Sequence, residues 1–543
     1  MKRWLCVLIT VWINAAAFAA DGIWNSPSGG VWSVSDNWSD GIVADGEGYS
    51  ADFTVLMSEP LVKVNDPSAR TLGRLLFGGE SESLAWLLDD ADAAGQPTGA
   101  PLVLSHPSGR PEVTVSNTTV YLAKQLAGAA GLLKTGTGPL YLLTNGVISG
   151  QTEVREGRLS FGLPASESEF EVVAYYSFDD PQNIGADSSG KGNHLSAQGT
   201  VSYSASGRFD GGAYFDGSAY LTRQSLQGFP SGDESFTMAA WVKTDSTNRQ
   251  AVIGWGNKTA NRSYTAIQLQ PESNDIQHYV IDSSYWFTTP AKDQTSGWMH
   301  VALVYDSAAK QRTFYVNGVR GKSKSTPVLT IPDQELMVGL AYTTLRYFSG
   351  VMDDVIVTKG ALSENRIRLL MAGKISTSVA VDAASEISVG TYGTVEIHKE
   401  TALGALAGTG TLYGTASNVA ITGPAVFAGR IEGPTRVEVA VGAGEIAALS
   451  GANSYTGGTR VLSGSLEVKD AGDLFSHVVA YYTFDDPSAL GKDRSGNGND
   501  LTIRYTTRPL PFYVSGGKAG GAVCITNDNW LARNQTRFSG LST

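Results

Sequence analysis

The sequence predicts an all-β chain that is assembled from repeated modules. Gly, Thr, Ser, Val and Tyr are abundant and charged helical patterns are few, which favours strands. Short apolar stretches alternate with polar residues, and glycines or Asn-Gly pairs mark the turns between them. One segment also occurs twice without a gap, as VVAYYSFDDPQNIGADSSGKGNHL at 172–195 and VVAYYTFDDPSALGKDRSGNGNDL at 478–501. The chain is therefore a string of modules in which one type is used twice.

Residues 1–20 have the pattern of a secretory signal peptide. Lys2 and Arg3 precede an apolar stretch, and Ala17-Phe18-Ala19 forms a small-residue cleavage site. The alternative is a membrane anchor, but the apolar stretch is short for a span of about 20 residues. We therefore expect a secreted or cell-surface protein with no transmembrane segment after cleavage of the signal.

Charge and cysteine content restrict the partners and the stabilising chemistry. The formal net charge is −12, and removal of Lys2 and Arg3 makes it more negative. An acidic exported chain without a basic cluster is a poor partner for nucleic acid or anionic lipid. Without Cys6, Cys524 stands alone, so no intramolecular disulfide can form. Burial, hydrogen bonds or metal ions must hold the fold.

Two regions, 21–165 and 375–474, consist of short strands separated by glycine-rich turns. Such strands suit stacked coils in which each coil pairs with the next. The segment ALSGANSYTGGTRVLSGSLEVKD at 448–470 resembles the autotransporter-associated β-strand repeat of long secreted bacterial β-helices, and 131–162 matches it more loosely. The resemblance implies a right-handed parallel β-helix. The alternative is a glycine-rich β-sandwich.

The region 166–374 has longer and more aromatic strands. We expect strands at 235–242, 298–305, 312–316 and 350–358. In the first of them Phe236, Met238, Ala240 and Val242 share one face.

Local signals set the turns and the single helix expected in this region. Asn317-Gly318 predicts a tight hairpin turn after the strand at 312–316. Ser363 is a candidate N-cap for a short helix at 366–371, which Gly373 would close.

This order of elements resembles the laminin-G-like jelly roll of the concanavalin A-like lectin/glucanase superfamily. The resemblance is carried by residues 176–179, 187–193, 212–217, 236–242, 298–305 and 314–318, and by 352–355 followed by 361–363. It implies two packed antiparallel sheets. The predicted fold is thus an antiparallel jelly-roll sandwich at 166–374, flanked by parallel β-helix-like repeat segments, with an incomplete second jelly roll at 475–543. Because the second copy matches only the first three elements, we expect it to be poorly packed and interpret the chain as truncated.

A calcium site is the first candidate for chemistry. The D-x-S-G-x-G-N loop places the carboxylate of Asp187 and the amide oxygen of Asn193 on one glycine-rich turn, and hard cations bind such oxygens. Asp353 and Asp354 lie on a strand and point to opposite faces, so one of them must find a partner in the interior. The resemblance implies calcium near these elements, with Asp187, Asn193 and Asp354 as ligands and Asp179 in reserve. The alternative is that Asp187 and Asn193 cap turns and Asp354 accepts hydrogen bonds.

A ligand surface is the second candidate. Aromatic residues crowd into HYVIDSSYWF at 278–287, and exposed aromatic faces bind sugar rings by stacking. We predict Tyr285 and Trp286 as ligand-binding residues. Aromatic residues at strand spacing are more often part of a core, and we expect this of Trp241 and Trp298.

No catalytic residue is predicted. Glycan-cleaving relatives carry paired carboxylates on one strand in an E-x-D-x-(x)-E pattern, which this sequence lacks. The acidic group at 89–92 lies outside the jelly roll, and we expect it to be a solvated turn. The six histidines are scattered, and neither an H-E-x-x-H motif nor a Gly-x-Ser-x-Gly elbow occurs.

The sequence thus favours a non-enzymatic binding or adhesion protein that recognises an extracellular glycan or protein, with Ca²⁺ as a candidate cofactor and the β-helix as a rigid spacer. Two alternatives remain open. One is a glycan-active hydrolase or lyase whose catalytic domain lies outside this sequence, and the other is an inert structural passenger. The ligand, the anchoring mechanism and the oligomeric state do not follow from the sequence.

Overall fold

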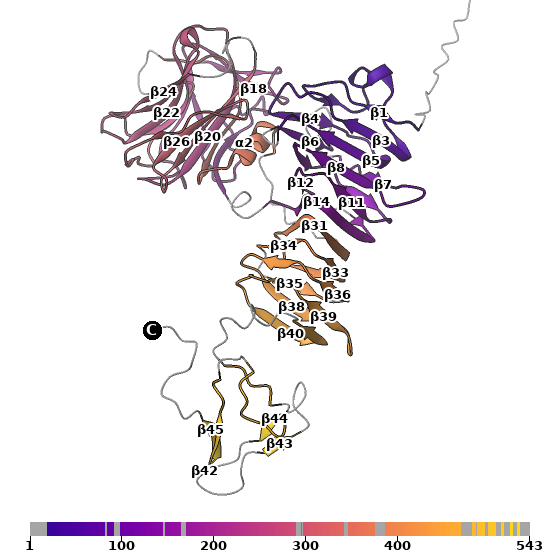
Figure 1. Ribbon diagram of the computed structural model, residues 1–543. Helices are drawn as coiled ribbons and strands as arrows, with labels where there is room; N and C mark the ends of the chain where they lie inside the picture. Colours follow the sequence, from indigo (N-terminus) through magenta and orange to yellow (C-terminus); the bar gives the residue numbers. More distant parts are fainter. Residues whose placement is uncertain are drawn as a thin grey trace, which may run out of the picture. The chain divides into compact units, whose positions relative to one another are not determined.

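The computed structural model is nearly all β, and Glu364–Met371 forms the α-helix α2 (Figure 1). It describes residues 19–81, 84–91, 98–144, 147–163, 170–288, 295, 297–341, 346–374, 386–415, 418–468, 480–484, 486–494, 498–505, 512–514, 522–524 and 529–532. The chain divides into two compact units, residues 1–385 with 395–399 and residues 386–394 with 400–543. The predicted signal peptide lies almost entirely outside the described residues and stays a prediction.

The first unit begins with parallel stacked strands. They are β1 (Gly22–Ile23), β2 (Gly30–Val31), β3 (Gly46–Phe53), β4 (Leu61–Asn65), β5 (Arg70–Gly78), β6 (Ala85–Asp89), β7 (Leu102–Leu104), β8 (Glu112–Ser116), β9 (Thr119–Leu122), β10 (Leu126–Gly128), β11 (Leu132–Thr135), β12 (Leu140–Leu142), β13 (Val147–Ile148) and β14 (Gln151–Phe161), with the short 3-10 helices η1 (Ser35–Asn37) and η2 (Ser39–Gly41). Each strand pairs with one that lies a coil further on; β4 pairs with β6, β6 with β9 and β9 with β12. The predicted β-helix-like architecture is confirmed for this region.

Aromatic side chains fill the start of this β-helix. Trp24, Trp32, Trp38 and Phe53 are all buried. Their ring centroids lie close together, at 5.1 Å for Trp24 and Trp38 and 5.2 Å for Trp32 and Phe53. Such rings bury a large apolar area and favour edge and tilted contacts. The tryptophans near the start of the sequence are thus the core of the first coils.

The acidic group at 89–92 is not a solvated turn in its described part. Asp89 ends β6 and is fully buried, and Asp90 is 6 % exposed. The Asp89 carboxylate pairs with the Lys63 ammonium at 3.2 Å and with that of Lys374 at 2.6 Å. The expectation of a solvated turn was wrong because these two lysines, one from β4 and one from beyond α2, supply the charge that burial requires.

Two antiparallel sheets form the jelly roll. The nine-stranded sheet contains β17 (Val201–Ser204), β18 (Gly212–Asp216), β30 (Ser349–Lys359), β20 (Phe236–Lys243), β25 (Met299–Asp306), β26 (Gln311–Val316) and β27 (Val319–Arg320) in this order, with β15 (Glu171–Tyr176) on β30 and β28 (Lys324–Ser325) on β26. The seven-stranded sheet runs β16 (Ser196–Gln198), β19 (Tyr220–Arg223), β29 (Leu336–Val338), β21 (Gln250–Gly256), β22 (Tyr264–Gln270), β23 (Asp275–Val280) and β24 (Tyr285–Thr288), and η3 (Pro271–Ser273) links β22 to β23.

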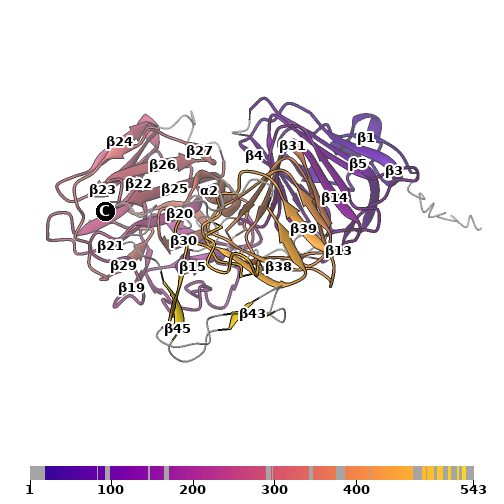
Figure 2. The same cartoon turned by 60° about the horizontal axis from the view of Figure 1, so that its bottom comes forward.

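The main core of the jelly roll lies between these sheets. Phe236, Met238, Ala240 and Val242 of β20 all belong to it, which confirms the face predicted from their spacing. The neighbouring Ala239 points to the other side, where α2 packs on the nine-stranded sheet (Figure 2). The outer face of the nine-stranded sheet is thus covered by a helix, whereas residues that follow β29, among them Leu340, Ala341 and Tyr347, pack on the outer face of the seven-stranded sheet.

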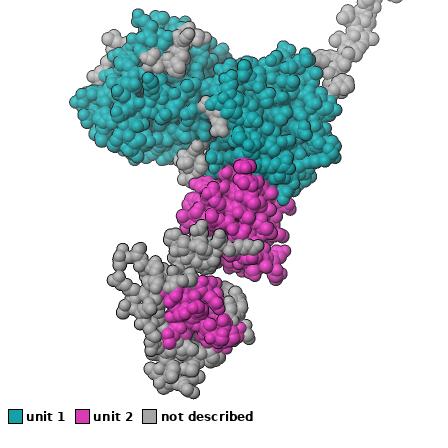
Figure 3. Space-filling view, viewed as in Figure 1, with its two compact units in different colours: residues 1–385, 395–399 teal, residues 386–394, 400–543 magenta. Residues whose placement is uncertain are grey.

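The second unit, magenta in Figure 3, contains parallel strands. They are β31 (Glu386–Ile397), which begins in this unit, β32 (Thr401–Leu403), β33 (Ala405–Gly408), β34 (Thr411–Gly414), β35 (Asn418–Ile421), β36 (Ala425–Phe427), β37 (Arg430–Glu432), β38 (Arg436–Ala440), β39 (Ile446–Leu449), β40 (Thr459–Ser463) and β41 (Ser465–Glu467). Small antiparallel pairs follow, β42 (Thr502–Tyr505) with β45 (Asn529–Ala532) and β43 (Phe512–Val514) with β44 (Ala522–Cys524). Much of 475–543 lies outside the described residues, so its expected poor packing stays a prediction.

Candidate functional site

A row of polar side chains crosses the outer face of the seven-stranded sheet. The strand register places Trp286 opposite Gln277, Gln277 opposite Gln268, and Gln268 opposite Ala251. Directly opposed residues of antiparallel strands lie side by side on one face. Since Ile276 of β23 lies in the core between the sheets, its neighbour Gln277 and the whole row face outward.

A second row beside it is apolar and contains small residues at its centre. Tyr279 pairs with Ala266, Ala266 with Gly254, and Gly254 with Met337. A side chain at Gly254 would meet the Ala266 methyl at 2.5 Å and the Tyr264 hydroxyl at 2.8 Å. The Tyr264 ring therefore lies over the glycine, and with Met337 it forms an apolar floor on this face.

Arg346 lies over both rows. Its backbone oxygen accepts a hydrogen bond from the amide of Ala251 at 3.0 Å, which fixes the residue next to β21. Its Nη1 donates to Oε1 of Gln268 at 2.7 Å, and its guanidinium carbon lies 5.5 Å from the Tyr279 ring centroid. The guanidinium is thus held by an amide and an aromatic ring.

Arg249 has a matching arrangement on the other side of the polar row. It donates a hydrogen bond to Oε1 of Gln277, and its guanidinium carbon lies 4.5 Å from the Trp286 ring centroid. Burial and the nearby Arg346 charge lower the pKa of Arg249 to about 10. The two arginines are therefore close enough to repel each other. We call the set formed by Arg249, Gln268, Gln277, Tyr279, Trp286 and Arg346 the tyrosine–arginine face.

The two predicted ligand-binding residues point in opposite directions. Trp286 lies on the tyrosine–arginine face with 37 % of its surface exposed. Tyr285 pairs with His278 and packs partly buried against the core between the sheets. The guanidinium of Arg312 lies 5.4 Å from its ring. Adjacent strand residues face opposite sides, so only Trp286 joins the candidate site.

One protein-family match covers the whole tyrosine–arginine face. Residues 212–368 match the Laminin_G_3 family, which is described as the concanavalin A-like lectin/glucanases superfamily. This part of the chain is similar to that superfamily. The match confirms the jelly-roll part of the resemblance, whereas the autotransporter-associated repeat stays a prediction. No curated protein matches the chain.

Several solved structures are similar to part of the chain at low sequence identity. Domain 4 of AbnA, a GH43 extracellular arabinanase from Geobacillus stearothermophilus solved with arabinotriose, is 23 % identical with a TM-score of 0.32, and the match covers 37 % of this chain and 99 % of that one. The botulinum neurotoxin serotype D binding domain is 14 % identical with a TM-score of 0.30, over 38 % of this chain and 51 % of that one. The binding domain of Paraclostridial Mosquitocidal Protein 1 is 14 % identical with a TM-score of 0.29, over 37 % and 52 %.

The predicted calcium ligands Asp187 and Asn193 lie together in a closely hydrogen-bonded loop. Oδ1 of Asp187 accepts hydrogen bonds from the amides of Tyr175 and Ser189 at 3.0 and 2.9 Å, and Oδ2 accepts from the Ser189 hydroxyl and the Asn193 amide at 2.9 and 2.8 Å. Oδ1 of Asn193 accepts from the amide of Gln227 at 2.8 Å. These hydrogen bonds fix the Asp187 carboxylate and the Asn193 amide within the loop.

Three hydrogen bonds of the first loop recur at the described residues of the second copy. The Asp493 carboxylate accepts from the amides of Tyr481 and Asn499 at 3.0 and 2.8 Å. The Tyr482 hydroxyl donates to the carbonyl of Asn499, as that of Tyr176 does in the first copy. The described residues at the two ends of this segment are thus hydrogen-bonded in the same way in both copies.

Tyr175 joins Asp354 to this loop, since its amide donates to Asp187 and its hydroxyl donates to Oδ1 of Asp354 at 2.6 Å. Asp179, the reserve ligand, accepts from the amide of Gly211 at 3.0 Å. Within the described ranges no group of three or more His, Cys, Asp and Glu side chains is arranged to hold a metal ion. Calcium binding stays a prediction.

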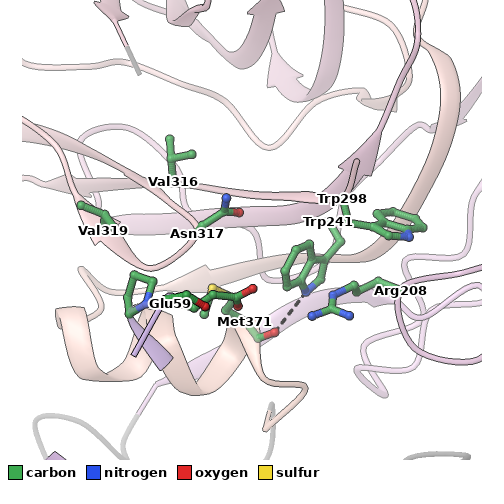
Figure 4. Close-up of a pocket in the computed structure, with 10 residues that line it drawn as sticks. Glu59, Arg208, Trp241, Trp298, Val316, Asn317, Val319 and Met371 are labelled. Carbon is green, nitrogen blue, oxygen red and sulfur yellow. Dashed lines mark hydrogen bonds between the residues drawn. The ribbon is translucent and has the colours of Figure 1, made fainter. Parts of the chain in front are cut away.

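A pocket of about 590 Å³ lies at the edge of the jelly roll (Figure 4). It is lined by Ser58, Glu59, Pro60, Arg208, Trp241, Trp298, Val316, Asn317, Val319 and Met371. Trp241 is buried as expected, and its indole N–H donates to the Met371 carbonyl at 3.1 Å. Trp298 was expected in the core but is only partly buried and lines the pocket, because it precedes β25 rather than belonging to it.

Membrane insertion by a helix finds no support in the described part of the chain, where no helix has the length and apolar character to span a bilayer.

Proposed function

We propose that the jelly roll binds an extracellular glycan through the tyrosine–arginine face. The chain would then act as a secreted or cell-surface binding protein, with its β-helical segments as spacers. The observation that carries the proposal is the joint presence of the exposed indole of Trp286 and the half-buried guanidinium groups of Arg249 and Arg346 on one side of the seven-stranded sheet. Binding sites for small ligands combine aromatic surface with a few placed polar groups in this way.

The composition of this face favours binding over hydrolysis. Glycosidases that use paired carboxyl groups hold them about 5–10 Å apart on the two sides of the scissile bond. The polar members of the tyrosine–arginine face are two glutamines and two arginines, none of which serves as such an acid or nucleophile. We therefore propose recognition without cleavage.

A glycan array probed with the full chain tests the proposal. Trp286→Ala should lose binding to the glycans that the wild type captures, because it removes the exposed ring and the support of Arg249. Tyr392→Ala is the matched control, since Tyr392 is 81 % exposed and belongs to another unit. Full binding by Trp286→Ala would contradict the assigned face.

The same array separates the rival functions. New reducing ends on captured glycans would support the hydrolase alternative. Capture of no glycan, with or without EDTA, would support the inert structural alternative. Loss of glycan capture in EDTA, with capture retained in its absence, would support calcium as a cofactor.

A further inference from the structure

The tyrosine–arginine face carries two cations without carboxylate partners. Among the described residues neither Arg249 nor Arg346 forms an ion pair with a carboxylate, although the chain has a formal net charge of −12. Asp275 is the acid on the same side of β23. It begins the strand opposite Gln270 and accepts a hydrogen bond from the hydroxyl of Ser273 at 2.8 Å. Among the described residues, the groups that hold these two half-buried guanidinium groups are neutral, namely the Gln268 and Gln277 amides and the Tyr279 and Trp286 rings.

The polar atoms left on this face are mainly donors. The Oε1 atoms of Gln268 and Gln277 are both occupied by the arginines. Nε2 of Gln268 is buried and has no hydrogen-bond partner, and the same is true of Nε of Arg249. Gln268 itself has no exposed surface. A buried donor without an acceptor costs free energy. The Gln268 amide is closed off from solvent, so the donors within reach of a ligand are the N–H groups of the half-buried Arg249 and Arg346.

The excess of donors distinguishes between classes of saccharide. A neutral sugar presents hydroxyls, which donate as well as accept and therefore need protein acceptors. A carboxylate or sulfate group only accepts and carries the charge that the two guanidinium groups lack. Planar guanidinium groups bind such oxyanions with two parallel N–H bonds.

We propose that the tyrosine–arginine face selects an acidic saccharide, with Arg249 and Arg346 on its carboxylate or sulfate group and Trp286 beside the sugar ring. This inference rests on the proposed function and adds the charge class of the ligand.

Binding of matched oligosaccharides by the full chain tests the inference. The probes are an oligogalacturonate, its methyl ester, which has the same rings without charge, and a sulfated galactan oligosaccharide. The acid should bind at least about tenfold more tightly than the ester, and its affinity should fall as salt rises. Comparison of the affinities for the oligogalacturonate and for the sulfated galactan oligosaccharide shows whether the face prefers a carboxylate or a sulfate group.

Variants assign the effect to the two arginines. Arg249→Met combined with Arg346→Met should lose the preference for the acid. Arg346→Lys, in an otherwise wild-type chain, should retain part of the preference because the charge remains. Arg430→Met, which removes an exposed arginine paired with Glu432 in the other unit, is the matched control. Circular dichroism and the melting curve report whether each variant is folded.

The outcomes separate the inference from the proposed function. Equal binding of acid and ester, lost for both in Trp286→Ala, would overturn the charge class and leave glycan binding intact. Binding of none of the saccharides would overturn the proposed function as well. Acid-selective binding that survives the double methionine substitution would place the anion elsewhere and contradict the assignment.

Discussion

Asp353 and Asp354 are adjacent on β30 and meet different surroundings. The Asp353 carboxylate accepts from the amides of Arg208, Phe209 and Asp354 at 2.7–2.9 Å. Asp354 has a φ of 46° where the register of β30 shifts, so the strand bulges and turns its carboxylate to the Tyr175 hydroxyl. Burial, together with the neighbouring Asp354, raises the pKa of Asp353 to about 8, and burial raises the pKa of Asp354 to about 6.

Because of these two carboxyl groups, we expect the free energy of unfolding to depend on pH. Both folded-state pKa values lie above the ordinary value of 3.8. At pH values between this ordinary value and the folded-state pKa values, the folded chain therefore binds more protons than the unfolded chain. Their contribution to the free energy of unfolding is fully present below about pH 4 and is lost as the pH rises to about 8. Asp353→Asn should flatten this slope in urea unfolding measured across that range. Asp216→Asn, at an exposed loop-side aspartate, is the control, and equal slopes for Asp353→Asn and wild type would contradict the assignment.

At the scale of elements, the loop 187–193 is stabilised by hydrogen bonds to a buried carboxylate. Asp187→Ala would leave the amides of Tyr175, Ser189 and Asn193 without acceptors. Each buried unsatisfied donor costs about 1–3 kcal/mol, so the jelly roll should lose on the order of 3 kcal/mol of stability. Urea unfolding in calcium and in EDTA measures the loss. Asp180→Ala, at an exposed aspartate that accepts from the amide of Gln182, is the control.

The stability loss of Asp187→Ala, measured with and without calcium, distinguishes a hydrogen-bonding role of the Asp187 carboxylate from a metal-binding role. Hydrogen bonding predicts the same loss for Asp187→Ala in calcium and in EDTA. A loss confined to the calcium sample would show that the carboxylate acts as a metal ligand instead.

Local elements of the jelly roll could be predicted from the sequence because their signals are local. Asn317 and Gly318 both have positive φ, as the predicted hairpin turn between β26 and β27 requires. The Ser363 hydroxyl accepts from the amide of Arg366 at 3.1 Å, which confirms the predicted N-cap of α2. Both signals lie within a few residues of the structure that they set.

The tyrosine–arginine face could not be predicted, apart from Trp286. Arg249, Gln268, Gln277 and Arg346 are far apart in the sequence, and the register of β21, β22 and β23 brings them together. No spacing rule links them, because the register depends on the packing of the whole sandwich. The burial of Asp89 could not be predicted for a similar reason, since its partner Lys374 lies far away in the sequence, beyond α2.

At the scale of the first unit, Asp89 links the β-helix to the end of the jelly roll. Lys63 comes from β4 of the β-helix, and Lys374 follows α2 of the jelly roll. The Lys63 ammonium also donates to the carbonyl of Ala372 at 3.3 Å. The buried carboxylate therefore holds two cations from parts of the chain that are distant in sequence.

Removal of this charge should weaken the first unit. Asp89→Asn should lower its free energy of unfolding by on the order of 2 kcal/mol, less than for a fully buried pair because each lysine side chain is 21 % exposed. Urea unfolding followed by tryptophan fluorescence measures the loss. Glu153→Gln removes a more exposed partner of Arg110 and Arg155 and should cost below about 1 kcal/mol. An equally small effect for Asp89→Asn would show that the link does not stabilise the unit.

Hydrogen exchange of the whole chain, with and without the oligosaccharide that binds best on the array, tests the central claim most directly. Glycan binding by the tyrosine–arginine face predicts slower exchange in peptides that cover β21–β24 and 346–348, and unchanged exchange at 187–193 and in the second unit. Protection around Trp298, or protection confined to the β-helix, would contradict the claim.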